Sequence, residues 1–172
     1  LDAMMVIPPW RLSNKQIETI TDYATKIAKS FNIRGPFNLQ FLINNDQVFV
    51  IELNIRASRS MPFVSKLVKT NLIDLASQAV LGKEIPKITP DKWKTTQTHG
   101  IKMPQFSFMQ LEGADIVLGV EMQSTGEAAC FGDSFYDALS KGLISVGYHL
   151  PKTGTALITI GGSENKEKLL QT

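Results

Sequence analysis

The sequence predicts an α+β fold in which helices flank a mostly antiparallel sheet, and three observations support it. Residues 37–55 contain two runs of alternating apolar and polar side chains around a short polar stretch, which is typical of an antiparallel hairpin. Residues 14–31 and 134–146 place apolar side chains at helical spacing after a serine that can cap each helix. Residues 71–82 form a third helical stretch, which ends at a glycine.

The first helix begins with a capping box, because Ser13 is followed three residues later by Gln16. Its apolar stripe consists of Ile17, Ile20, Ala24, Ile27, Ala28 and Phe31. The opening segment LDAMMVIPP, at 1–9, reads as the end of a strand whose sheet lies upstream, so we expect the chain to be part of a larger protein.

The hairpin has one apolar and one mixed face. The apolar face, which we expect to be core, consists of Phe37, Leu39, Phe41, Ile43, Phe49, Ile51, Leu53 and Ile55. A three-residue loop at 45–47 would set Gln40 opposite Glu52 and Asn38 opposite Asn54 on the other face. The polar groups of that face therefore converge at the end remote from the turn.

The converging polar groups suit a metal bound to phosphate. One carboxylate, Glu52, and the amide carbonyls of Gln40 and Asn54 offer oxygen ligands, which Mg²⁺ prefers. Arg56 and Arg59 follow directly, and a guanidinium group binds phosphate oxygens with two parallel hydrogen bonds. The alternative is that these side chains form only the solvated face of a sheet.

Two further helices and one connection complete the expected elements. The helix at 71–82 has Asp74 in its first turn and is expected to pack against the sheet, whereas 83–100 has no periodicity and is expected to be a surface connection. Ser134 caps the last helix, whose apolar stripe is Phe135, Ala138, Leu139, Leu143 and Val146.

Composition limits the possible partners. The 172 residues are 43% hydrophobic and carry a net charge of +2, so bulk charge favours neither nucleic acid nor a membrane surface. Cys130 is the single cysteine, which excludes an internal disulfide, and two histidines cannot complete a zinc site with it. Without a long apolar run or a secretory signal, a cytoplasmic location is expected.

The stretch GPFNLQFLINNDQVFVIELNIRASRSMPFVSKL resembles the large subunit of carbamoyl-phosphate synthetase, in the C-terminal part of an ATP-grasp unit, and MQSTGE continues the resemblance. The resemblance implies that Gln40, Glu52 and Asn54 bind Mg²⁺ or Mn²⁺, and that Gln40 and Glu52 also bind ATP. It implies that Arg56 and Arg59 are catalytic residues near the phosphates.

The resemblance also implies a domain organisation and a function. Residues 1–150 would be the C-terminal portion of an ATP-grasp domain, and 151–172 a linker and the truncated start of a methylglyoxal-synthase-like effector domain, with the first strand of its Rossmann-like α/β fold at 155–160. The implied enzyme is an ATP-dependent carbon-nitrogen ligase that phosphorylates carbamate to carbamoyl phosphate, for pyrimidine or arginine biosynthesis.

Several partners of the whole enzyme follow from the same resemblance. They are a glutaminase subunit or fused glutaminase domain, a small-molecule effector, K⁺ as a further ion, and other copies in an oligomer. The chain alone is expected to be inactive, because the lid that closes over the nucleotide would lie upstream.

Alternatives stay open at this point. The chain could belong to another ATP-grasp carboxylate ligase, against which the run RASRSMPFVSK argues, or it could be a non-catalytic effector-response or interaction module. Lys66 and Lys69 fit a solvated helix face better than a phosphate site. Residues 125–127 could be a substrate-side loop or a turn before a strand.

Overall fold

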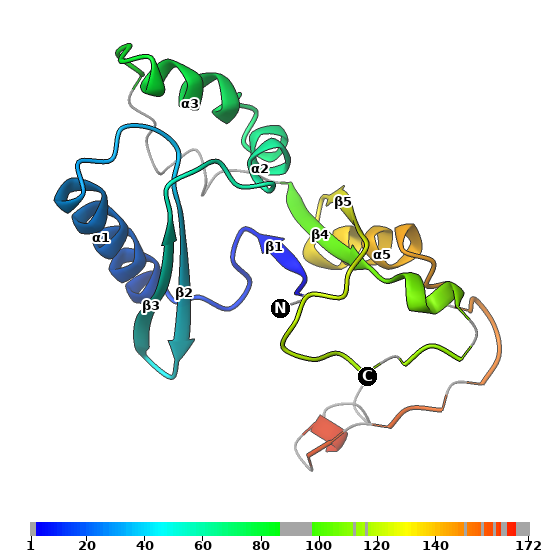
Figure 1. The fold of residues 1–172 in the computed structure, drawn as a ribbon. Coiled ribbons are helices and arrows are strands. Elements are labelled where there is room, and N and C mark those ends of the chain that lie inside the picture. Colours follow the sequence, from blue (N-terminus) through cyan, green and yellow to red (C-terminus); the bar gives the residue numbers. More distant parts are fainter. Residues whose placement is uncertain are drawn as a thin grey trace.

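The computed structural model contains two antiparallel sheets with helices around them, which confirms the α+β fold (Figure 1). It describes residues 3–86, 98–111, 113–115, 117–149, 151–155, 157–159, 161–162 and 165–167. The larger sheet has the strand order β1-β4-β5, and the smaller one is the hairpin β2-β3.

The three-stranded sheet joins the start of the chain to its second half. Strand β1 (Met5–Ile7) pairs antiparallel with β4 (His99–Gln105), which pairs antiparallel with β5 (Gly126–Gly132). In this structure the partner of the opening strand therefore lies downstream, in β4, and β1 is the edge strand of the sheet. The surface connection expected at 83–100 was wrong at its end, where β4 begins, and its segment 87–97 lies outside the described residues.

Helices cover both faces of this sheet. On one face, Gly142 of α5 (Phe135–Ser145) lies against Ile101, whose side chain is fully buried. On the other face, Phe63 of α2 (Met61–Leu67) stacks on Phe131 of β5 with 5.4 Å between ring centroids. Successive residues of β4 thus contact different helices, as strand geometry requires.

Helix α5 has the predicted start. The Ser134 hydroxyl accepts a hydrogen bond from the backbone N–H of Asp137 at 3.1 Å. Ala138 of the predicted apolar stripe is completely buried against the sheet, and the other four members are half-buried. The prediction of this helix and of the face it buries is confirmed.

Asp137 makes the stability of α5 pH-dependent. Its pKa is lowered because Lys141 Nζ hydrogen-bonds to the carboxylate at 2.8 Å and the backbone N–H of Asp133 donates to it at 3.2 Å. A pKa that is lower in the folded state gives stability above the unfolded pKa, and this stability is lost as pH falls through the folded value. We expect Asp137→Asn to lower the Tm slightly at pH 7, a difference that disappears at acidic pH.

Thermal unfolding from pH 7 to pH 2 would check this expectation. The double variant Asp137→Asn with Lys141→Met is the control, because removing both partners should cost less than the sum of the single changes. A Tm difference that persists unchanged at the lowest pH would contradict the assignment.

Helix α1 (Asn14–Ser30) follows the predicted boundaries closely and lies beside the hairpin (Figure 1). Its capping box is complete, because Gln16 N–H donates to the Ser13 hydroxyl at 3.2 Å and Ser13 N–H donates to Gln16 Oε1 at 2.8 Å. Gln16 Nε2 also donates to the carbonyl of Asn45 in the hairpin turn, at 3.2 Å. Phe31, the last member of the predicted apolar stripe, is 66% exposed.

Helix α3 (Leu72–Val80) forms where predicted but packs differently. Asn71 caps it by accepting from the N–H of Asp74 at 3.1 Å, and Gly82 follows its end with a φ of 72°. The helix packs against α2 and not against a sheet, which corrects the expected packing. Part of its apolar face stays open, and Val80 is 66% exposed.

The C-terminal segment does not form the expected strand. Residues 155 and 157–159 are not in a strand, and within the described part of the segment only 165–167 are helical. Leu157 is 93% exposed there. Across the chain, none of the helices in the described ranges is long and apolar enough to cross a membrane.

Candidate metal and phosphate site

The hairpin brings the predicted oxygen ligands together. Strands β2 (Asn38–Asn44) and β3 (Gln47–Asn54) pair antiparallel, with Gln40 opposite Glu52. Asn38 lies opposite Asn54 one pair further from the turn, as the sequence predicted. Because paired residues share a face of the ladder, these polar side chains lie on one side of the hairpin.

The route to this pairing differs from the prediction. Asn44 pairs with Gln47, so the loop has two residues, and Asn45 adopts a positive φ of 54°. Two-residue turns with positive φ match the twist of the flanking strands, which favours them over a three-residue loop. A register shift between Gln40 and Phe41 then adds one residue to β3, which restores the pairing at the remote end.

The shorter turn and the register shift together change which side chains of the hairpin are exposed. Three residues predicted for the core are exposed instead: Phe49 at 44%, Ile51 at 54% and Ile55 at 63%. Phe49 pairs with Leu42, which is also exposed. The resulting surface, here called the open face, consists of Asn38, Gln40, Leu42, Phe49, Glu52 and Asn54.

The polar half of the open face suits a divalent cation. Asn54 Nδ2 donates to Glu52 Oε1 at 2.9 Å, and this hydrogen bond uses neither the amide oxygen of Asn54 nor the second carboxylate oxygen of Glu52. Among the described residues, no three His, Cys, Asp or Glu side chains gather in one place. One carboxylate with amide oxygens suits Mg²⁺, which keeps several waters and also binds phosphate oxygens. Glu52, Asn54 and Gln40 would hold such an ion.

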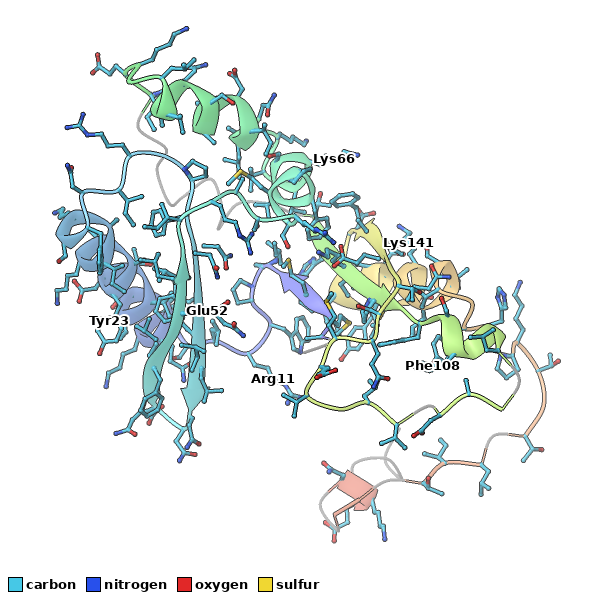
Figure 2. The ribbon with its side chains drawn as sticks, in the orientation of Figure 1. Arg11, Tyr23, Glu52, Lys66, Phe108 and Lys141 are labelled. Carbon is cyan, nitrogen blue, oxygen red and sulfur yellow. The ribbon has the colours of Figure 1, made fainter. Side chains whose placement is uncertain are left out.

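The two predicted phosphate-binding arginines, Arg56 and Arg59, have different surroundings. Arg56 bonds locally, and its guanidinium donates to the carbonyl of Ala57 at 3.2 Å. Arg59 instead lines a pocket of about 280 Å³ between α2 and the sheet β4-β5. Figure 2 shows Glu52 on the hairpin and Lys66 on α2, and the segment 55–60 with both arginines connects these two elements.

The pocket contains charged residues that the sequence analysis did not assign to a site. Lys102 Nζ forms an ion pair with Glu127 at 2.7 Å and lies 3.4 Å from the Ser60 hydroxyl. The Lys102 side chain is only 14% exposed, and a charge this well covered needs its partners. The remaining lining residues are Pro62, Phe63, Lys66, Ala129 and Phe131.

Comparison with known proteins assigns the family. Residues 1–88, just over half of the chain, match the family model described as "Carbamoyl-phosphate synthase L chain, ATP binding domain". The chain belongs to this family. It is 47% identical over 169 residues to "Multifunctional protein ura1" of Schizosaccharomyces pombe, and 41% identical over 168 residues to the "Carbamoyl phosphate synthase large chain" of Lachnoclostridium phytofermentans.

Both of these relatives are much longer than this chain. The matches cover 98% and 96% of the chain but only 7% and 16% of those two proteins. Among solved structures, N5-carboxyaminoimidazole ribonucleotide synthetase from Thermus thermophilus is similar, with a TM-score of 0.60 and 17% identity over 87% of this chain and 44% of that one. This likeness shows the ATP-grasp fold that the resemblance implied.

Two residues that line the pocket between α2 and the sheet carried weak sequence signals. Lys102 is a charged residue between apolar neighbours in the segment GIKMP, which is unusual for a strand that is covered on both faces. Glu127 lies in the segment 125–127 that was considered as a substrate-side loop. Their contact could not be read from the sequence, because it depends on how β4 pairs with β5.

Proposed function

We propose that this chain supplies the metal-phosphate side of the nucleotide site in a carbamoyl-phosphate synthase, which uses ATP to phosphorylate carbamate. The observation that carries the proposal is the pairing of Gln40 with Glu52 on the open face, next to Asn54. Membership of the carbamoyl-phosphate synthase family supports it. The basic pocket, joined to this face by the segment 55–60, adds a place for an anionic acceptor.

The open face has two halves that fit two parts of ATP. Leu42 and Phe49 lie opposite each other and are 54% and 44% exposed, so they offer an apolar surface to the base. Glu52 and its neighbours lie further from the turn and would hold Mg²⁺ or Mn²⁺ at the phosphates. An ion held by these residues would supply positive charge to neutralise the phosphates during transfer.

The pocket suits the acceptor because three of its charged side chains are cationic and one is anionic. Arg59 and Lys102 would orient carbamate, and Lys66 would add positive charge. In the reaction, a carbamate oxygen attacks the γ-phosphorus of ATP, and the bond from that phosphorus to the bridging oxygen breaks. ADP leaves with the electron pair. Carbamate is already an anion, so none of these residues has to remove a proton.

Properties of the whole protein belong to the same proposal. We propose that 1–150 is the ATP-grasp portion and that 151–172 leads into an effector domain, for which the exposed Leu157 and Ile158 provide apolar surface to bury. A fused glutaminase would fit relatives named as multifunctional proteins. The effector, the oligomer, K⁺, the pyrimidine or arginine pathway and the cytoplasmic location stay predictions.

The test is the reverse reaction in the full-length gene product. Incubation with carbamoyl phosphate and Mg-ADP should form ATP. A coupled luciferase assay measures the ATP formed. The absence of ATP formation from a folded, Mg-ADP-binding protein would contradict carbamate as the acceptor. It would favour another ATP-grasp ligase.

Lys102→Met in the same protein tests the role of the pocket. Loss of the Lys102 ammonium group should raise the KM for carbamoyl phosphate by about tenfold or more, because a charged hydrogen bond to the anion is removed. The KM for Mg-ADP should stay unchanged, since the nucleotide contacts the open face. Lys83→Met, at an exposed position, is the matched control. If Lys102→Met raised the KM for Mg-ADP as much as the KM for carbamoyl phosphate, the assignment of the pocket to the acceptor would be contradicted.

A further inference from the structure

The ladder between β2 and β3 is interrupted at one place, directly beside the proposed metal ligands. Phe41 pairs with Val50, and the next pair is Gln40 with Glu52. Ile51 therefore has no partner in β2, which is the pattern of a β-bulge. The irregularity lies where the open face changes from apolar to polar.

The extra residue decides on which face Glu52 lies. An uninterrupted ladder from the same two-residue turn would pair Gln40 with Ile51 and Leu39 with Glu52. Paired residues share a face, so the carboxylate would then join Leu39 on the half-buried side of the hairpin. With the bulge, it lies on the exposed side with Gln40 instead.

Core packing does not explain the bulge. The Ile51 side chain is 54% exposed, so burial of this side chain cannot be what holds the extra residue in place. A bulge disrupts the local ladder, bends the strand and increases its twist, and it therefore changes the direction of the side chains that follow. The residues that follow are Glu52 and, two positions later, Asn54. Their mutual hydrogen bond of 2.9 Å means that a change in direction affects both.

We propose that the bulge at Ile51 orients Glu52 and Asn54 toward the metal and phosphates, so that Ile51 is a positioning residue for the site. It acts through its extra backbone unit and not through its side chain. The inference rests on the proposed function, since it requires that Glu52 binds a metal.

The test moves the bulge without changing the pairing of the ligands. In the full-length protein, Ile51 is deleted and one alanine is inserted between Val48 and Phe49. Chain length, the two-residue turn and the pairing of Gln40 with Glu52 are all kept, but the bulge lies nearer the turn. Ile51→Ala, which keeps the bulge and removes most of the side chain, is the matched control.

Binding of Mn²⁺, followed by the electron paramagnetic resonance signal of the free ion, is the readout. We expect Ile51→Ala to bind within about twofold of the unchanged protein, and the displaced bulge to weaken binding at least about tenfold, as for other changes that misorient metal ligands. Circular dichroism and Tm check that both variants are folded. Unchanged affinity with the displaced bulge overturns the proposal.

Two further experiments distinguish a variant that does not fold, a wrong proposal for the bulge and a wrong proposed function. If the displaced variant does not fold, deletion of Ile51 alone gives a regular ladder with Glu52 still opposite Gln40, and the same loss of affinity is expected. Failure of both variants to fold would make the bulge a requirement for folding and would overturn the positioning role. Unchanged Mn²⁺ binding by Glu52→Gln would instead contradict the proposed function.

Discussion

Glu52→Gln in the full-length protein is expected to lower the rate of ATP formation from carbamoyl phosphate and Mg-ADP by at least about 100-fold, a loss typical of removing one preorganised electrostatic contact from a transition state. The substitution keeps the size of the side chain and one acceptor oxygen, but it removes the charge and replaces the second oxygen by an NH2 donor. It would remove the carboxylate from a site whose other protein ligands, Gln40 and Asn54, are neutral.

The fold should survive this change. Glu52 is exposed, and its one side-chain hydrogen bond, from Asn54, can be made by a glutamine oxygen as well. The Tm of Glu52→Gln should therefore match that of the unchanged protein. Glu18→Gln, at an exposed position of α1, is the control for loss of a negative charge elsewhere. Equal activity in Glu52→Gln and Glu18→Gln would remove the basis for a metal at the open face.

Gly132→Ala is expected to have the largest effect on stability. A Cβ at this position, the last of β5, would lie 2.7 Å from Asp137 Oδ2 and would also collide with the backbone N of Ala138 in the first turn of α5. The backbone of a capped helix cannot shift as a flexible side chain can. Overpacking of this kind costs about 1–3 kcal/mol of unfolding free energy, which corresponds to several degrees in Tm.

Gly119→Ala is the matched control for this experiment. Apart from its chain neighbours, no heavy atom of the described residues lies within 4 Å of a Cβ built at Gly119, so the same chemical change there should leave the Tm nearly unchanged. Thermal unfolding followed by circular dichroism measures both. A Gly132→Ala protein as stable as the Gly119→Ala protein would show that α5 can move away from β5 at little cost.

Local signals predicted the helices well. The capping serines Ser13 and Ser134 both form the hydrogen bonds that their spacing indicated, because a cap depends only on residues within one turn. The pairing of Gln40 with Glu52 was also predicted, but from a three-residue loop, whereas a two-residue turn and a bulge produce it in the structure. The metal and catalytic roles of the site residues stay predictions.

Longer-range features were not visible in the sequence. The two-residue turn moves Phe49 to the open face, and the bulge at Ile51 then restores the predicted pairing of Glu52. Alternation alone shows neither the turn length nor the place where a ladder gains a residue. Strand β4 was missed because Lys102 and Gly100 interrupt its apolar pattern. Those two residues face α2, so their roles depend on a helix that joins the sheet from another part of the sequence.

The placement of β4 between two helices separates two kinds of evolutionary constraint. Ile101 and Lys102 are neighbours in the chain, yet the first is buried under α5 and the second reaches the charged pocket under α2. Ile101 and Met103 set the volume that packs against α5, whereas Lys102 sets the charge that β4 contributes to the pocket on the other face. A change of charge at Lys102 can therefore leave the packing under α5 intact, within a single strand of seven residues.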